Sequence, residues 1–94
     1  MNRSDLVKRI QKAYPDLHGV EADRVVRIVF NEIEEALARG DRAEFRGFGS
    51  FSVRLRPAHT GRNPKTGAAV QVPEKSVPYF RAGKELRKRV DTEE

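Results

Sequence analysis

The residues whose chemistry stands out are the basic side chains of residues 54–75. This segment carries a net charge of +4, because its only acid is Glu74 and five of its residues are arginine or lysine. The five basic residues are Arg54, Arg56, Arg62, Lys65 and Lys75. A cationic segment with too few apolar side chains to build a core needs a polyanion to lie against. This pattern indicates nucleic acid as the ligand.

Turn-forming residues occupy the centre of the same segment, in the run Asn63-Pro64-Lys65-Thr66-Gly67. Pro64 presets a φ suited to a turn, and Gly67 can adopt positive φ. The residues on both sides of this turn are strand-like. We therefore predict a two-stranded β-arm over residues 54–75. The remaining residues, 1–53 and 76–94, form the body of a single domain.

The distribution of charge separates the two halves of the chain. Residues 1–40 contain as many acidic as basic side chains, so their net charge is zero, and residues 41–94 carry the whole net charge of +5. An N-terminal half with many charged side chains but no net charge is typical of a solvated surface. The basic C-terminal half predicts an electrostatic contact with nucleic acid.

Length and composition limit the classes of protein. The chain has 94 residues, of which 37% are hydrophobic, and an outward-pointing arm leaves only about seventy to build a core. We therefore expect a second subunit to complete that core. The sequence contains no cysteine, which suits a reducing compartment, and no apolar run of signal-peptide or membrane length. We expect a cytoplasmic protein without a membrane partner.

Two helices are predicted in the N-terminal half. Asn2 can cap the first of them, with Asp5 completing a capping box. The helix is broken at residues 15–19, where a proline and a glycine occur. The second amphipathic helix covers residues 20–39, and Gly40 supplies its C-terminal stop. The two form a helical hairpin whose apolar faces need a cover.

The periodicity changes to two in the C-terminal half, over residues 42–46 and 51–56. The glycines of Gly47-Phe48-Gly49 predict a tight turn between these strands. The chain then returns as a strand at residues 70–80, and residues 83–90 predict a short helix. The expected fold class is α+β: a helical hairpin, a three-stranded antiparallel sheet that extends into the long β-arm, and a C-terminal helix.

Three phenylalanines are candidates for a core shared between two subunits. These are Phe48, Phe51 and Phe80. A body of about seventy residues offers each ring too little of its own fold for burial, and burying one phenylalanine stabilises a protein by roughly 1.5–3 kcal/mol. We therefore predict a dimer core at these positions.

The sequence contains no convincing catalytic or metal-binding pattern. His18 and His59 are far apart and have no clustered carboxylates nearby. The run from Gly61 to Gly67 superficially resembles a phosphate loop, but no glycine precedes Lys65 and no helix follows. No serine–histidine–acid arrangement has supporting context. We predict no enzyme activity, no cofactor, no metal and no small-molecule substrate.

Two motifs at a fixed spacing carry a resemblance to a known family. Gly47-Phe48-Gly49-Ser50-Phe51, followed ten residues later by Gly61-Arg62-Asn63-Pro64-Lys65-Thr66-Gly67, resembles the bacterial histone-like HU/IHF family. The resemblance covers the chain from Asn2 to Leu86. It implies an intertwined dimer in the bacterial nucleoid whose two β-arms reach around double-stranded DNA through the minor groove and bend it. HU and IHF are themselves standard examples of this binding mode. The implied roles are in recombination, replication, transcription and translation control.

The resemblance also implies roles for individual residues. Pro64 would insert between base pairs as a rigid apolar wedge, whereas the residues alone are equally consistent with an ordinary turn proline. Arg62, Asn63 and Lys65 would hold the groove beside the wedge. Other basic residues would contact the DNA backbone. Along the arm these are Arg54, Arg56 and Lys75, and on the body they are Lys84 and Arg87.

The strand before the Gly-Phe-Gly motif bears on the branch of the family. Arg42, Glu44 and Arg46 share one strand face, where Glu44 can hold both arginines, and HU usually has an apolar residue where Arg46 stands. This pattern resembles the beta-type subunits of integration host factor, which select sites largely through DNA shape and pair with an alpha-type subunit. An exposed, salt-bridged strand without a reading role is the alternative.

Three other functions remain open. One is a protein–protein module whose arm clasps an acidic partner, which only the charge of the arm favours. Ala82 is typical of HU, so a homodimeric HU-type protein that binds DNA non-specifically is the alternative within the family. An RNA-binding or ribosome-associated protein is the alternative from another class. The lack of aromatic residues in the basic arm argues against it, because single-strand binding depends on stacking bases on aromatic rings.

Overall fold

The computed structural model describes residues 1–91 and has the predicted α+β order of elements. The helices and strands are α1 (Arg3–Ala13), α2 (Gly19–Ala38), β1 (Ala43–Phe45), β2 (Gly49–Arg56), β3 (His59–Arg62), β4 (Ala69–Val72), β5 (Lys75–Ala82) and α3 (Lys84–Val90). Both ends of α1, α2 and α3 lie within one or two residues of the sequence prediction. The arm, by contrast, does not consist of two continuous strands. It is formed by the outer ends of β2 and β5, which pair with each other, and then by β3 and β4, which form a second pair.

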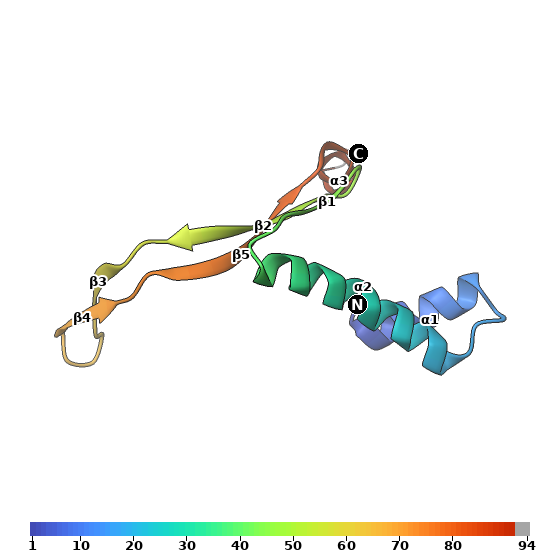
Figure 1. Cartoon of the computed structure of the whole chain (residues 1–94), viewed down its shortest axis with the longest axis horizontal. Coiled ribbons are helices and arrows are strands. Elements are labelled where there is room, and N and C mark those ends of the chain that lie inside the picture. Colours follow the sequence, from blue (N-terminus) through green and yellow to red (C-terminus); the bar gives the residue numbers. More distant parts are fainter. Residues whose placement is uncertain (92–94) are drawn as a thin grey trace.

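The molecule is elongated, with a radius of gyration of 19.1 Å and principal extents of 59, 38 and 30 Å. A compact domain of this length has a radius of about 12 Å. The difference arises because the arm strands β3 and β4 extend far from the helical hairpin of α1 and α2 (Figure 1). The chain therefore has a small body and a long projection.

Local residue chemistry fixes the ends of the first two helices. The Asn2 side chain accepts a hydrogen bond from the Asp5 N–H at 2.9 Å, and the Asn2 N–H donates to the Asp5 carboxylate at 3.1 Å. This is the predicted capping box. At the end of α2, Gly40 has φ +78°, and the Asp41 N–H donates to the Ala36 carbonyl at 2.8 Å. Both observations confirm the predicted helix boundaries.

The core of the helical hairpin is small. Val7 of α1 packs with Ala22 and Val26 of α2 as its buried residues. Leu6, Ile10 and Leu17 surround them and are only partly buried. Much of the apolar face of α2 lies outside this cluster, so the two helices alone do not cover it.

Strands β1, β2 and β5 form the predicted three-stranded antiparallel sheet, in the order β1-β2-β5. The turn between β1 and β2 lies one residue earlier than the sequence indicated. The Phe48 N–H donates to the Phe45 carbonyl at 2.9 Å across a turn in which Gly47 has φ +88°. Gly49 is therefore the first residue of β2, and it is buried.

Strand pairing in the arm is interrupted once, between the β2–β5 pairs and the β3–β4 pairs. Arg56 pairs with Lys75 as the last pair of β2 and β5, and His59 pairs with Val72 as the first pair of β3 and β4. Pro57 and Pro73 lie in the gap. Proline has no N–H to donate to a strand ladder. The two prolines therefore account for the division of the arm.

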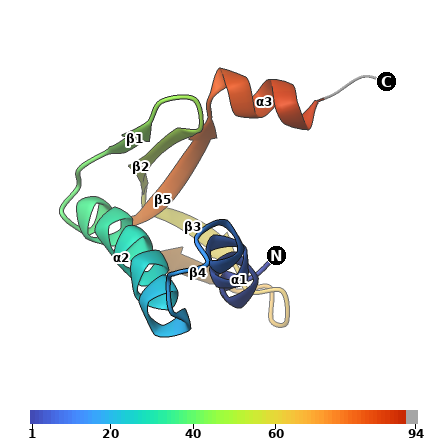
Figure 2. The ribbon, with the colours of Figure 1, turned by 90° about the vertical axis from the view of Figure 1, so that its right-hand side faces the viewer.

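Helix α3 projects from the end of the sheet that is opposite the arm. Figure 2 shows α3 following β5 on the far side of the sheet from α1 and α2. Gly83 precedes α3, and the Gly83 N–H donates to the Phe48 carbonyl at 2.8 Å. This bond ties the start of α3 to the turn between β1 and β2. Within residues 1–91, no helix is long and apolar enough to cross a membrane.

Candidate nucleic-acid interface

The register of the sheet separates its side chains into an apolar and a polar face. Residues directly opposite each other on neighbouring strands point to the same side. Phe51 lies opposite both Ala43 and Phe80, and Val53 lies opposite Pro78. The other face carries polar and basic residues. Its pairs are Glu44–Ser50, Ser50–Arg81, Ser52–Tyr79, Arg54–Val77 and Arg56–Lys75.

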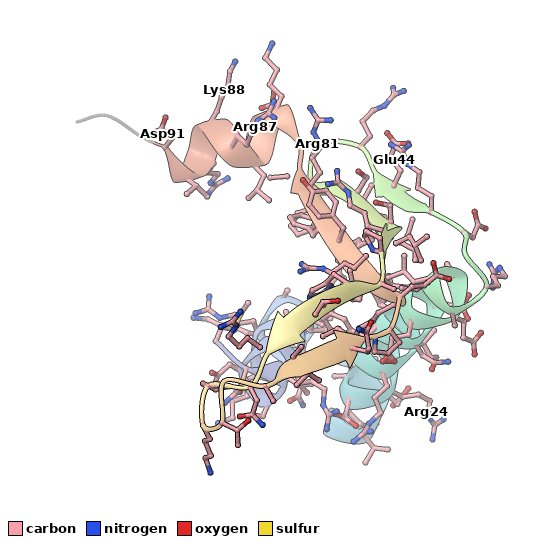
Figure 3. All side chains as sticks on the ribbon, turned by 90° about the vertical axis from the view of Figure 1, so that its left-hand side faces the viewer. Arg24, Glu44, Arg81, Arg87, Lys88 and Asp91 are labelled. Atoms are coloured by element: carbon pink, nitrogen blue, oxygen red, sulfur yellow. The ribbon has the colours of Figure 1, made fainter. Side chains whose placement is uncertain are left out.

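An open cleft of about 580 Å³ lies on this polar side, where β1, the end of β5 and the start of α3 meet. Its charged lining residues are Arg42, Glu44, Arg46, Arg81, Lys84 and Arg87. Glu44, Arg81 and Arg87 lie on this side of the molecule in Figure 3. Five of the six charges are positive, so the cleft suits a phosphate backbone.

The cleft unites two groups of residues that the sequence predicted separately. The predicted site-preference residues Arg42, Glu44 and Arg46 line it, together with the predicted backbone contacts Lys84 and Arg87. Arg81 was missed in the sequence, although it lines the same cleft. Its position depends on its pairing with Ser50 across the sheet, which the spacing of residues along β5 does not reveal.

Glu44 contacts only one of the two arginines that it was expected to hold. Its carboxylate lies 3.7 Å from the Arg42 guanidinium, and both side chains are largely exposed. Arg46 lies in the turn after β1 and forms no ion pair within residues 1–91. The expectation that all three share a strand is wrong for both arginines, because β1 contains only Ala43–Phe45 and Arg42 lies just before it. The charge of Arg46 remains available to a ligand.

The tip of the arm is a closed turn with Pro64 exposed on it. The Asn63 N–H donates to the Ala68 carbonyl at 2.9 Å, and the Gly67 N–H donates to the Asn63 carbonyl at 2.7 Å. The Asn63 side chain accepts from the Lys65 N–H at 2.8 Å. Asn63, predicted as a DNA contact, thus also shapes the turn. None of these bonds involves Pro64.

The basic residues of the arm lie on β2, β3 and β5 and in the turn at its tip. Those predicted to contact DNA are Arg54, Arg56, Arg62, Lys65 and Lys75, and each is exposed. Arg56 and Lys75 lie directly opposite each other. Like charges at this separation repel, and an anion between them would relieve the repulsion. The arm therefore presents uncompensated positive charge to its surroundings.

Arg54 has a partner that the sequence did not reveal. Its guanidinium carbon lies 3.5 Å from the centroid of the Tyr79 ring. This distance is well within the range of a cation–π contact. Tyr79 lies two residues closer to the body than Val77, the direct partner of Arg54, so the contact is diagonal across β2 and β5.

The three phenylalanines predicted for a shared core lie together on the apolar side of the sheet and its adjoining turn. Phe80 contacts both others, with ring centroids 4.8 Å from Phe51 and 5.5 Å from Phe48. Phe48 is 49% exposed and Phe80 38% exposed. The rings therefore cluster without being covered. Several apolar side chains of α2 are also half-exposed, namely Val25, Ile28, Val29 and Phe30.

An ion-pair network links the two N-terminal helices away from the cleft. Asp23 of α2 lies 2.6 Å from the Arg27 Nε and 3.7 Å from the Arg3 Nε. The hydrogen bond from Arg27, aided by the charges of Arg27 and Arg3, holds the pKa of Asp23 below its ordinary value. Both arginines are partly neutralised here. In residues 1–91, no three histidine or carboxylate side chains are grouped so that they could hold a metal ion.

Comparison with known proteins gives a consistent result over nearly the whole chain. Residues 1–91 match the family described as bacterial DNA-binding protein. The chain is 52% identical over 93 residues to integration host factor subunit beta of Dichelobacter nodosus, covering 99% of this chain and 97% of the relative. It is also 52% identical over 91 residues to the same subunit of Azoarcus, covering 97% of each.

Solved structures match the fold. HU of Anabaena, in a cocrystal with DNA, is 38% identical with a TM-score of 0.88, and the match covers 97% of this chain and 98% of that one. A mutant of HU from Thermotoga maritima is 27% identical with a TM-score of 0.70, covering 97% of this chain and 100% of that one. These matches confirm the resemblance and the fold class that the sequence indicated.

Proposed function

Because the chain belongs to the bacterial DNA-binding protein family, we propose that it is an architectural subunit that bends double-stranded DNA. The family consists of nucleoid-associated proteins and not of enzymes. DNA binding is therefore the established part of this function. The bend, the site preference and the roles of individual residues are the proposed part.

The observation that carries the proposal is the shape and charge of the arm. A two-stranded projection bears exposed basic residues and ends in a closed turn (Figure 1). This turn contains the exposed Pro64. Basic residues on such a ribbon can contact phosphates on both sides of the minor groove. An apolar wedge at the tip can unstack a base step, which kinks the duplex toward the major groove.

The basic cleft on the body supports a second contact with the same duplex. It lies on the polar side of the sheet from which the arm continues, so a bent duplex can reach both. Bending is favourable only when the additional contacts offset the deformation energy of the DNA, which is of order 1–6 kcal/mol for a short site. Lys84 and Arg87, with Arg81, would provide such contacts.

Arg46 is the residue that we propose contributes to site preference. It lines the cleft and lies in a turn where it has no acidic partner among the described residues. Because the family relatives at 52% identity are integration host factor beta subunits, we propose that the protein selects its sites through DNA shape. We propose that Arg46 contributes to this selection.

We propose that the active form is a dimer with a homologous alpha-type subunit. The exposed phenylalanine cluster and the half-exposed face of α2 support association with a second subunit. A homodimer of the HU type is the second candidate, favoured by Ala82, a residue that is typical of HU at this position. Purification of the chain alone and with an alpha-type subunit, followed by sizing and by DNA titration, distinguishes the two.

A salt titration of DNA affinity tests the proposed function. With on the order of 6–10 phosphates neutralised per dimer, affinity for duplex DNA is expected to fall about 10³–10⁵-fold between 50 and 200 mM salt. A nicked or pre-bent duplex of the same sequence should bind more tightly than the intact one. A flat salt dependence, or stronger binding to single-stranded RNA, would instead favour an RNA-associated function.

A further inference from the structure

We propose that Tyr79 is a positioning residue that holds the Arg54 guanidinium ready for a DNA phosphate at the base of the arm. This inference rests on the proposed DNA-bending function. Its foundation is the contact of 3.5 Å between the guanidinium carbon of Arg54 and the centroid of the Tyr79 ring. The pair lies where the arm leaves the body.

The geometry of the sheet brings the two side chains together. Ser52 is the direct partner of Tyr79, and Val77 is the direct partner of Arg54, so the two residues are diagonal neighbours, offset by two residues along the strands and on the same face. Diagonal neighbours on one face are about 7–8 Å apart at their backbones, which suits a long side chain and an aromatic ring. Both residues thus lie on the polar face, with Arg56 and Arg81.

The nature of the partner matters for the charge of Arg54. A carboxylate would restrain the guanidinium but also neutralise it, as Asp23 partly does for Arg27. Arg54 forms no ion pair within the described residues 1–91. The ring attracts the cation through its quadrupole and carries no net charge. Tyr79 therefore restrains Arg54 while leaving its full positive charge for a phosphate.

Restraint before binding should increase affinity. A flexible side chain that becomes ordered in a complex loses conformational entropy, and this loss lowers the affinity. A side chain that is already ordered in the free protein loses less. Arg56 is a natural comparison, because it lies two residues further along the same strand face. Its direct partner across the strands is Lys75, a like charge. Arg56 makes no cation–π contact within residues 1–91.

The central experiment is a double-mutant cycle on the dimeric protein, with fluorescence-detected titration of a duplex at several salt concentrations. Tyr79→Leu is expected to weaken binding about two- to five-fold, the size of an exposed cation–π contact. The slope of affinity against salt should stay unchanged, because Arg54 still reaches the phosphate. Arg54→Gln should reduce that slope.

The cycle separates positioning from general structural damage. Adding Tyr79→Leu to Arg54→Gln should cause no further loss, whereas adding it to Arg56→Gln should cause the full loss. Tyr79→Phe keeps the ring face and should retain most of the affinity. In the free protein, NMR should detect an upfield ring-current shift of the Arg54 side-chain protons that Tyr79→Leu abolishes and Tyr79→Phe preserves.

The outcomes also separate this inference from the proposed function. Equal losses from Tyr79→Leu in the Arg54→Gln and Arg56→Gln backgrounds would overturn the positioning role. So would an unshifted Arg54 resonance in the folded wild-type protein, even if Tyr79→Leu did not fold. A wild-type protein that bound duplex DNA without salt dependence would overturn the proposed function itself.

Discussion

Phe51 of β2 and Phe80 of β5 are direct cross-strand partners, and their ring centroids lie 4.8 Å apart. Phe80 is nevertheless 38% exposed. Phe48 and Phe45 extend the same cluster through contacts with Phe80 and Phe51, respectively. An aromatic cluster of this size on the face of a small sheet is a partly formed core. Its completion by a second subunit is the simplest way to remove the remaining apolar surface from water.

We predict that the isolated chain is a dimer at micromolar concentration and that its thermal midpoint rises with protein concentration. Phe80→Ala should remove shared core packing and lower the stability of the dimer by about 3–5 kcal/mol. Sedimentation and thermal unfolding at several concentrations test this. Tyr14→Ala, at a position that is 68% exposed, is the control and should change little. A stable, folded monomer of 10.7 kDa would contradict the prediction.

A second prediction concerns Gly49, the first residue of β2. A Cβ atom there would lie 2.6 Å from the Arg81 carbonyl oxygen and 2.7 Å from the Phe80 Cζ. Neither atom can move freely, since one is backbone and the other belongs to the packed aromatic cluster. Gly49→Ala should therefore lower the free energy of unfolding by about 1–3 kcal/mol, measured by urea denaturation.

Gly61→Ala is the matched control for Gly49→Ala. The nearest atom to a Cβ at Gly61 is the Val72 Cγ2 at 3.4 Å, and this glycine does not have positive φ. We expect less than 1 kcal/mol of destabilisation from this change. Equal effects of the two substitutions would mean that the close approach at Gly49 relaxes without cost.

The parts of the fold that could be predicted from the sequence depend on local chemistry. Asn2 and Asp5 cap the start of α1, and Gly40 with its positive φ ends α2. Each of these signals lies within a few residues of the helix end that it determines. The alternation in β2 likewise identifies a strand and its apolar face. These features need no knowledge of distant segments.

The features that could not be predicted depend on pairing between distant segments. Arg81 belongs to the basic cleft only because of the register of β5 against β2, and the same register brings Tyr79 to Arg54. The position of Arg46 in a turn was missed for a different reason. Gly47 and Gly49 both permit a turn, but only Gly47 has positive φ, whereas Gly49 pairs with Phe45 and with Ala82 as the first residue of β2.

A third prediction concerns the charge of Asp23. Its pKa is lowered first by the hydrogen bond from Arg27 and less by the charge of Arg3. A lowered carboxyl pKa gives stability that is present above the unfolded value and is lost as the pH falls through the native value. The ordinary value is 3.8, so this contribution should disappear below that pH.

NMR titration of the Asp23 carboxyl carbon measures this pKa directly. Arg27→Gln should return the pKa most of the way to its ordinary value, and Arg3→Gln should have the smaller effect, because its contact is 3.7 Å rather than 2.6 Å. If Arg3→Gln had the larger effect, the contact between the helices rather than the one within α2 would dominate in solution.

A fourth prediction concerns Arg46 and site preference. If Arg46 reads a site, Arg46→Ala should lower affinity at the preferred sequence by roughly 1–3 kcal/mol and leave binding to bulk DNA nearly unchanged. Competition titrations with selected and random duplexes, using the heterodimer, measure both quantities. Lys84→Ala is the comparison, because a phosphate contact should weaken binding to all sequences alike. Equal weakening by Arg46→Ala would identify Arg46 as a phosphate contact and favour an HU-type function.

The last prediction separates the two roles of Pro64. The turn at the arm tip is closed by bonds from Asn63, Lys65 and Gly67, and none of them involves Pro64. Pro64→Ala should therefore leave the turn folded and the basic residues of the arm in place. The substituted protein should still bind DNA, because the charge of the arm and of the body cleft is unchanged. It loses the rigid ring that would occupy an opened base step, and unstacking a step costs a few kcal/mol.

We therefore expect Pro64→Ala to reduce the bend more than it reduces docking, and to lose more affinity on an intact duplex than on one nicked at the kink. Energy transfer between dyes at the two ends of a short duplex measures the bend, with wild type and mutant on intact and nicked versions. Pro57→Ala, in the same arm but away from the tip, is the matched control and should retain the larger part of the bend. An end-to-end distance that Pro64→Ala leaves unchanged would identify Pro64 as a turn residue, and the bend would then arise from the contacts of the body.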